Sequence, residues 1–342
     1  MSKKITMEDI AKELGISKSI VSRALNDRYG ISNDTRSRVK LTALKMGYKV
    51  FTPKKGAFDK PESITIVVER YDLKDASFWV SIIDSIEKKL TQKGISVFLS
   101  ILDKDDDDFL PISIRQMKSS GVFIIGQIPL KVILSVINCG VSVVLIDSSF
   151  TFLKLDMIHA NNFSGAYEAT EYLIKEGHKK IGFIGSVSYA YSFKDRHRGF
   201  LQCIRQNGLC DPDLYSVTDK HDSYEVPFST AEFECKINRD IIASSYLCAN
   251  DVIASQIYDI LKKHGLRIPE DVSVIGFDNI TRCLWISPKL TTMDIPKSQI
   301  GESAVDVMLS RIREPKSNYK QMLIGTELIV RDSVRRITDL TE

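Results

Sequence analysis

The sequence predicts an α/β protein in which a small helical module precedes a two-lobed body of doubly wound parallel sheets. Three observations support this prediction. The chain has 342 residues, enough for two or three domains. Its first 50 residues show the 3.6-residue apolar period of helices. From residue 63 onward, short β-branched runs alternate with helix-period segments, which is typical of parallel sheets covered on both faces.

Three short helices are expected in the first 45 residues. Thr6 and Asp9 are spaced as in a capping box, so the first helix is expected over 7–14. After the turn GIS, Ser17 caps a second helix, KSIVSRALN. A third helix is expected over about 33–45. Two short helices joined by a tight glycine turn are typical of a helix-turn-helix.

The outward face of the second helix carries hydrogen-bond donors and no carboxylate before Asp27. A recognition helix needs such a face to reach guanine O6 and N7 in the major groove, and Arg23 is the strongest candidate for a base contact. The same geometry also occurs in purely structural bundles, so the pattern alone leaves both interpretations open. The residues of this module expected to bind DNA are Thr6, Ser17, Lys18, Ser19, Ser22, Arg23 and Asn26.

Charge is unevenly distributed along the chain. Residues 1–60 hold 14 Lys and Arg against 6 Asp and Glu, and residues 61–342 hold 33 against 38, which together give the net charge of +3. A basic segment joined to a mildly acidic body is typical of a separate polyanion-binding module. A solvated basic face without a partner gives the same balance, so charge alone does not decide.

Several classes of protein and site are not expected. The six cysteines form no C-x-x-C and the five histidines no i, i+4 pair, so we expect no metal, no cofactor and no disulfide framework. The sequence opens without an apolar signal segment and has no apolar run near the roughly 18 residues of a membrane span, so we expect a cytoplasmic protein that does not bind membranes. It lacks G-x-S-x-G and G-x-G-x-x-G, and no phosphate-loop lysine follows its G-x-x-x-x-G spacings, so we expect no enzyme.

The body alternates strand and helix patterns. Helix-period segments separate the first four apolar runs, and further helices are expected at 165–177, 194–208 and 251–265. Ligands of open α/β sheets bind outside the carboxyl ends of the strands, so we expect a site in the cleft between two lobes. Strands are expected at 64–69, 96–101, 122–126, 141–146, 180–185, 246–250 and 272–278.

The sequence also resembles a known family. TMEDIAKELGISKSIVSRALN, followed by ISNDTRSRV and GY, is similar to the headpiece of the lactose/galactose-repressor (LacI/GalR) family of bacterial transcription regulators. GAYEATEYLIKEGHKKIGFIG, DRHRGF, CANDVIASQIYDILKKHGLRIPEDVSVIGFDN and SPKLTTMDIP resemble the effector-binding body of that family, which is similar to periplasmic sugar-binding proteins. The resemblance covers nearly the whole chain. It implies a homodimer that binds operator DNA and responds to a small-molecule effector, a sugar or sugar derivative.

The resemblance also implies where the domains begin and end. A headpiece is expected at 1–50, a hinge or linker at 51–62, and an effector-binding and dimerisation domain at 63–342. Within that domain, lobe 1 is expected at about 63–160 and 293–322, and lobe 2 at about 161–290 and 323–342.

Arg196 and Asp251 are the central candidates for effector binding. Arg196 lies near a helix start in DRHRGF, where a surface ion pair with Asp195 is the alternative. Asp251 follows a strand in CAND, and the pattern alone favours a helix cap formed with Asn250. The family motifs imply instead that Arg196 is the main cation for the effector and that Asp251 accepts its hydroxyl groups.

Further residues complete the expected effector site. Phe78 and Trp79 open the first helix of the body, where an aromatic residue is either core or a stacking platform for a sugar ring. The resemblance implies that Asp278, in GFDN, lies at the cleft mouth, although an Asx turn explains it equally well. The effector residues assigned are Phe78, Trp79, Asp147, Arg196, Asn250, Asp251 and Asp278.

The linker departs from the family pattern. Family members usually carry a hinge helix here, with a leucine that wedges into the minor groove of the operator where this chain has Ala57. Pro53, Gly56 and Pro61 shorten any such helix, and Ala57 is too small to wedge between base steps, although Phe58 could replace it. We therefore expect affinity to depend more on salt, and less on DNA bending, than is usual in the family.

The function predicted from these observations is sequence-specific DNA binding that represses carbohydrate uptake or catabolism genes under the control of a sugar-like effector. The alternatives are a family member controlled by a protein co-regulator or a nucleoside-type ligand and, last, a sugar-binding or sugar-processing protein.

Overall fold

A computed structural model describes residues 5–25, 30–46, 48, 61–70, 73, 76–103, 110–116, 118–148, 150, 152–209, 212–218, 228–239 and 241–338. The chain divides into two compact units. Unit 1 comprises Met1–Ala76, Ile83–Ile158 and Gly301–Gln321, and unit 2 comprises Ser77–Ile82, His159–Ile300 and Met322–Glu342.

The N-terminal module consists of three helices, as the sequence predicts: α1 (Met7–Leu14), α2 (Lys18–Leu25) and α3 (Asn33–Lys45). Gly15 ends α1 with a φ of 64°, a left-handed conformation that glycine adopts without steric cost and that turns the chain toward α2. Apolar side chains from all three helices form the small core of the module, in which Ile10, Val21, Ala24, Val39 and Ala43 are fully buried.

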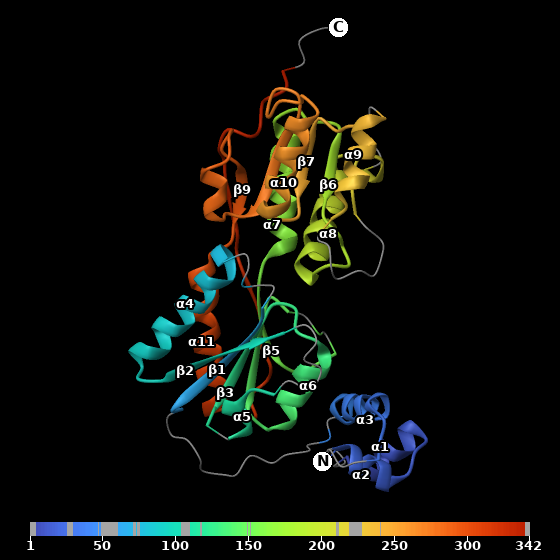
Figure 1. Ribbon diagram of the computed structural model, residues 1–342, viewed down its shortest axis with the longest axis vertical. Helices are drawn as coiled ribbons and strands as arrows, with labels where there is room; N and C mark the ends of the chain where they lie inside the picture. Colours follow the sequence, from blue (N-terminus) through green and yellow to red (C-terminus); the bar gives the residue numbers. More distant parts are fainter. Residues whose placement is uncertain are drawn as a thin grey trace. The chain divides into compact units, whose positions relative to one another are not determined.

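The larger sheet has six strands in the order β10-β5-β4-β3-β1-β2. The pairs among β1 to β5 are parallel. In Figure 1, α4 and α11 cover one face of this sheet and α5 and α6 the other. The strands are β1 (Ser63–Glu69), β2 (Ser96–Leu102), β3 (Gly121–Ile125), β4 (Ser142–Ile146), β5 (Asp156–Ala160) and β10 (Gln321–Ile324), and the helices are α4 (Ala76–Gln92), α5 (Ile112–Arg115), α6 (Leu130–Asn138) and α11 (Lys297–Arg313).

The second sheet lies in unit 2, with strand order β11-β9-β8-β7-β6. Its pairs are parallel except β11 with β9, which is antiparallel. The strands are β6 (Ile181–Ile184), β7 (Ser245–Cys248), β8 (Ser273–Asp278), β9 (Thr291–Asp294) and β11 (Glu327–Ile329). Around them lie α7 (Asn162–Lys175), α8 (Tyr191–Gln206), α9 (Thr230–Asn238) and α10 (Asp251–Lys263), with the 3₁₀ turns η2 (Pro212–Leu214) and η3 (Thr281–Leu284).

Close contact between α7 and α8 fixes the helix that carries Arg196. A Cβ atom added at Gly199 would lie 2.1 Å from the carbonyl oxygen of Phe163, so only glycine fits this position of α8 without a backbone shift. Arg196 lies one turn earlier on α8, and the packing of the two helices therefore sets the direction of its side chain.

The predicted α/β class, with its helix-turn-helix and two mostly parallel sheets, is confirmed. One expectation about the strands is wrong. SVFLSI was expected to be buried on both faces, but β2 is an edge strand in which Phe98 is 40% and Leu99 50% exposed. The apolar run reflects an uncovered surface here, because no described strand pairs with the outer edge of β2.

Candidate functional site

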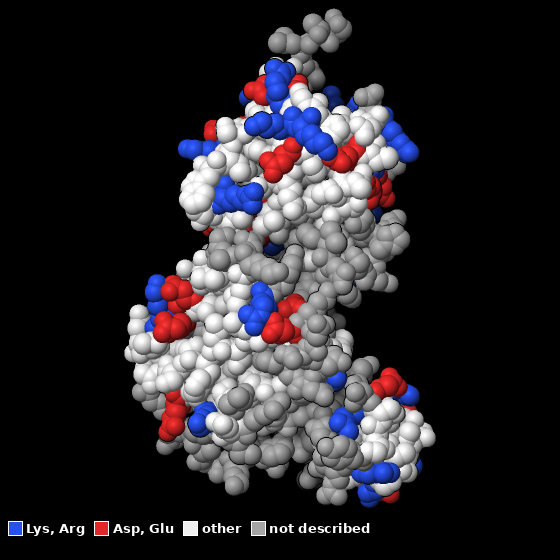
Figure 2. Space-filling model, viewed as in Figure 1, with Lys and Arg blue, Asp and Glu red and all other residues white. Residues whose placement is uncertain are grey.

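The outer face of α2 presents the donors that the sequence predicts. The side chains of Lys18, Ser19 and Arg23 are exposed, and Ser22 is partly buried. The Arg23 Nε donates to the backbone oxygen of Ser19 at 3.4 Å, which directs the guanidinium along this face. Lys18 and Glu8 form an exposed ion pair at 3.2 Å, a contact that costs little to exchange for a phosphate. Lys and Arg side chains are visible on the surface of the module in Figure 2.

Thr6 and Ser17 cap the two helices. The Thr6 hydroxyl accepts from the Asp9 backbone N at 3.3 Å and the Thr6 backbone N donates to the Asp9 carboxylate at 2.8 Å, so the capping box is complete. The Ser17 Oγ accepts from the Ile20 N at 3.3 Å and contacts Ser19 Oγ at 2.9 Å. These caps hold the helices in place, and both hydroxyl groups are exposed at the helix starts. Asn26, Ala57 and Phe58 lie outside the described residues.

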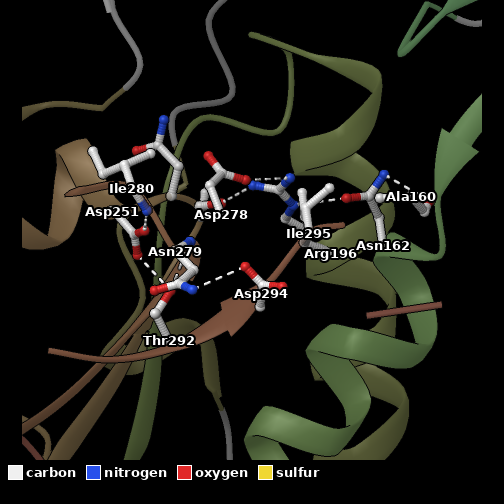
Figure 3. A network of polar contacts seen from close by, with 12 residues as sticks. Ala160, Asn162, Arg196, Asp251, Asp278, Asn279, Ile280, Thr292, Asp294 and Ile295 are labelled. Atoms are coloured by element: carbon white, nitrogen blue, oxygen red, sulfur yellow. Dashed lines mark hydrogen bonds and ion pairs between the residues drawn. The ribbon is translucent and has the colours of Figure 1, made fainter. Parts of the chain in front are cut away.

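A buried polar network in unit 2 is centred on Arg196 (Figure 3). The Arg196 side chain is 3% exposed. Its Nε donates to Asn162 Oδ1 at 2.8 Å and its Nη2 to Asp278 Oδ1 at 2.9 Å, while Nη1 donates to the Ala249 backbone oxygen. The surface ion pair considered for Arg196 belongs instead to Arg198, which contacts Asp195 at 2.9 Å. Arg196 therefore joins the ends of three elements: β7, β8 and the start of α7.

Asp278 ends β8 in an unusual backbone conformation. Its φ is 108° and that of Asn279 is 49°, and two successive non-glycine residues in this region are strained. The Lys297 Nζ donates to the Asp278 backbone oxygen. Asn279 donates to Asp294 at 2.9 Å and accepts from Arg331 at 2.7 Å, so side chains from several elements hold the turn. Strain maintained by so many contacts is typical of functional sites.

The Asp251 carboxylate is bound by the protein itself. It is the first residue of α10 and 2% exposed, with Oδ1 accepting from Thr292 Oγ1 at 2.6 Å and Oδ2 from the Ile280 N at 2.9 Å. Burial, together with the negative charge of Asp278, raises the pKa of Asp251 to about 7. Asn250 caps the same helix by accepting from the Ile253 N at 2.9 Å. Asn250 thus forms the cap, whereas the Asp251 carboxylate accepts from groups outside α10.

The remaining candidates lie elsewhere in the fold. Phe78 is buried on α4 and meets Trp79 edge to face at 4.8 Å between centroids, while the Lys297 Nζ lies 5.8 Å from the Phe78 ring. Asp147 follows β4 with a φ of 51° and is partly exposed. Among the described residues, Phe78 therefore borders the network only through Lys297, and Asp147 belongs to unit 1.

The sequence does not indicate the residues that support the network. Asn162, Thr292 and Lys297 each contact an assigned residue, but they lie on β9 or at the starts of α7 and α11. The pair Asn161-Asn162 directly after a strand could have indicated a site, but the five-residue strand β5 before it was not recognised. Among the described residues, no helix is long and apolar enough to span a membrane, and no group of three or more His, Cys, Asp or Glu could hold a metal ion.

The fold and these two groups of residues define a DNA-binding regulator with a ligand-binding body. Residues 6–50 match the model of the bacterial regulatory proteins of the lacI family, and residues 170–334 match the periplasmic binding protein-like domain. The chain belongs to the LacI family of bacterial regulatory proteins and is a transcription regulator, not an enzyme.

Similar proteins extend over the whole chain. The HTH-type transcriptional repressor PurR of Pasteurella multocida is 27% identical over 338 residues, which are 96% of this chain and 98% of that protein. A complex of the transcriptional regulator CelR with cellobiose has a TM-score of 0.70 at 20% identity, covering 96% of this chain and 99% of that one. The lac repressor dimer bound to operator and the anti-inducer ONPF has a TM-score of 0.68 at 21% identity, covering 97% and 100%.

Proposed function

We propose that this protein is a sequence-specific repressor of carbohydrate uptake or catabolism genes, that it acts in the cytoplasm, and that a sugar-like effector bound in the body controls its affinity for DNA. DNA binding is supported above all by the exposed hydrogen-bond donors on α2. The module that presents them has a complete capping box and a closed core. In the complex, Lys18, Ser19 and Arg23 contact DNA bases, and Thr6, Ser17 and Ser22 contact the sugar-phosphate backbone of the DNA.

The network around Arg196 supports a polyhydroxylated effector. A guanidinium has five N–H donors, of which three are used by Asn162, Ala249 and Asp278, so two remain for ligand oxygens. Asp278 supplies a carboxylate beside them. In our proposal Asn250 and Asp251 form the adjoining wall, and Phe78, Trp79 and Asp147, from the range expected for lobe 1, are further contacts of the effector. The cellobiose complex of CelR is consistent with a sugar as the ligand class.

The exposed edge strand supports our proposal of a homodimer. Phe98 and Leu99 are exposed on opposite faces of β2 at an unpaired sheet edge, where pairing with a second copy of the chain would remove the free edge from water. The lac repressor of similar fold is a dimer. We propose domain boundaries at residues 50 and 62. Within the body, we propose that the chain passes from one lobe to the other near residues 160, 290 and 322.

Selection from a random DNA library by the full chain tests both DNA binding and dimerisation. We expect one enriched sequence made of two inverted half-sites, because a two-fold dimer reads a palindrome. Failure to enrich any sequence would contradict the proposed function. A single half-site would contradict the dimer.

Arg23→Ala is expected to lower affinity for the selected site by about 1–3 kcal/mol and to relax preference at one base position, because alanine cannot form the bidentate hydrogen bonds to a base. Fluorescence anisotropy at fixed salt measures this change. Lys12→Ala, on the exposed surface of α1, is the matched control and should leave base preference intact. Equal losses on selected and random DNA for Arg23→Ala would remove it from base recognition.

A thermal-shift screen identifies the effector class. A ligand that binds the folded state raises its melting temperature, so a panel of sugars, sugar phosphates and nucleosides separates the candidates. We expect stabilisation by a neutral or acidic sugar. Stabilisation by nucleosides alone would favour the nucleoside-type ligand.

A further inference from the structure

A concave surface in unit 1 is distinct from the network around Arg196. It has a volume of about 500 Å³ and lies between the segment before β5 and the loop after α11. The residues that line it are Lys154, Pro315, Lys316, Ser317, Asn318 and Tyr319. We refer to it as the loop concavity.

The loop concavity is held in shape by a buried arginine beneath it. Arg311, 6% exposed, donates to both oxygens of Asp156 at 2.7 and 3.1 Å. It also donates to the backbone oxygens of Pro315, Ser317 and Asn318 at 3.3, 2.7 and 2.9 Å, and its guanidinium lies 4.6 Å from the Tyr319 ring centroid. A loop fixed by so many charge-assisted bonds is preorganised, so ordering it on ligand binding costs little entropy.

The exposed charge of the loop concavity is positive. Lys154 and Lys316 are both exposed, and no ion pair joins either of them to a described residue. The carboxylate of Asp156 is buried and neutralised by Arg311, so it does not offset these lysines. Arg313 and Lys320 nearby are also exposed, against the single acid Glu314 in the loop. The surface therefore fits an anion bound by the two flexible ammonium groups of Lys154 and Lys316, which come from the two segments that line it.

The position of the loop concavity at the sheet edge indicates which anion it binds. Parallel strands begin at the same edge, and β1 begins at Ser63, just after the segment that joins the body to the helix-turn-helix module. The loop concavity lies where β5 and β10 begin, and β5 is three strands from β1, or about 14 Å. A joining segment of 12 residues, 51–62, spans at most about 40 Å. A segment of this length allows DNA held by the module to approach this edge.

We propose that the loop concavity binds backbone phosphates of the DNA that flanks the site held by the helix-turn-helix module, with Lys154 and Lys316 as the donors. This inference rests on the proposed function. It assigns to the body of the protein a direct contribution to DNA affinity that carries no base preference, because phosphates are the same at every base pair.

The test uses Lys154→Gln/Lys316→Gln in the full chain and two duplexes, the selected site of about 20 base pairs alone and the same site with about 10 base pairs added on each side. On the long duplex, we expect lower affinity and a shallower dependence of log K on log salt, by about 0.9 for each phosphate that the lysines no longer neutralise. On the short duplex and in base preference we expect no change. Lys194→Gln/Lys262→Gln removes two exposed lysines of unit 2 and should match the wild type on both duplexes.

An unchanged salt slope on the long duplex, or an equal loss on the short one, would overturn the inference. If calorimetry shows inorganic phosphate binding that disappears in the double variant while the salt slope is unchanged, the loop concavity holds a small anion and the DNA assignment is wrong. If no sequence is enriched by the wild type, the proposed function fails, and the same comparison on random duplexes of both lengths still decides this inference.

Discussion

Arg196→Met is expected to lower the free energy of unfolding by about 3–5 kcal/mol, because it leaves the Asp278 carboxylate buried without its ion pair. The same change removes the donors to Asn162 and Ala249, so polar groups on three elements lose their partner together. Urea unfolding followed by circular dichroism measures the effect.

Arg198→Met is the matched control for this prediction. Arg198 lies on the same helix two residues on, and its side chain is 64% exposed, so the loss of its ion pair with Asp195 should cost less than about 1 kcal/mol. Adding Asp278→Asn to Arg196→Met should restore part of the lost stability, since no unpaired charge then remains buried. Equal effects of Arg196→Met and Arg198→Met would show that Arg196 is not the centre of the network.

Asp251→Asn is expected to remove a large part of the pH dependence of stability. The folded-state pKa of Asp251, about 7, exceeds the value of about 3.9 in an unfolded chain. The folded state therefore binds the proton more tightly, and the wild type should lose stability as pH rises from about 4 to 7, by at most about 4 kcal/mol at 1.36 kcal/mol per pKa unit. Asparagine does not titrate, so the variant lacks this loss.

The difference in unfolding free energy between the wild type and Asp251→Asn isolates the contribution of Asp251. Burial lowers the pKa of His159 and of His178 to about 4, which acts in the opposite direction, since stability is then lost as pH falls below the usual histidine range. Both histidines are present in wild type and variant, so their contribution cancels. Unfolding free energies at pH 5, 6, 7 and 8 give the comparison, with Asp259→Asn on the exposed face of α10 as control. Parallel pH curves for wild type and Asp251→Asn would contradict the prediction.

The sequence predicts the helix-turn-helix module well because its signals are local. The capping box of Thr6 and Asp9, the turn at Gly15 and the 3.6-residue period all lie within the helices that they define. The strands of the body are less predictable. β10 and β11 have four and three residues, too short for a periodic pattern, and they become strands because neighbouring strands pair with them.

The contacts within the candidate site are also poorly predictable from the sequence. A motif pointed to Arg196, but nothing local indicates that it contacts Asn162, 34 residues earlier, and Asp278, 82 residues later. For Asp251 the local pattern indicates a helix cap and the family motif an effector contact. Neither indicates that Thr292 and Ile280, from other elements, bind its carboxylate. Such partners depend on the crossovers of the sheet, which a period in the sequence does not encode.

In the proposed mechanism, a ligand bound at the Arg196 network changes the affinity of the protein for DNA. The most direct measurement is the dissociation constant of the selected duplex by fluorescence anisotropy, with and without a saturating amount of the ligand found by thermal shift. We expect a change of about 5- to 150-fold, the range of coupling free energies of 1–3 kcal/mol, and the same factor in ligand affinity when the duplex is present. An identical dissociation constant with and without ligand would rule out this coupling, because binding in the body would then have no effect on the module that holds the DNA.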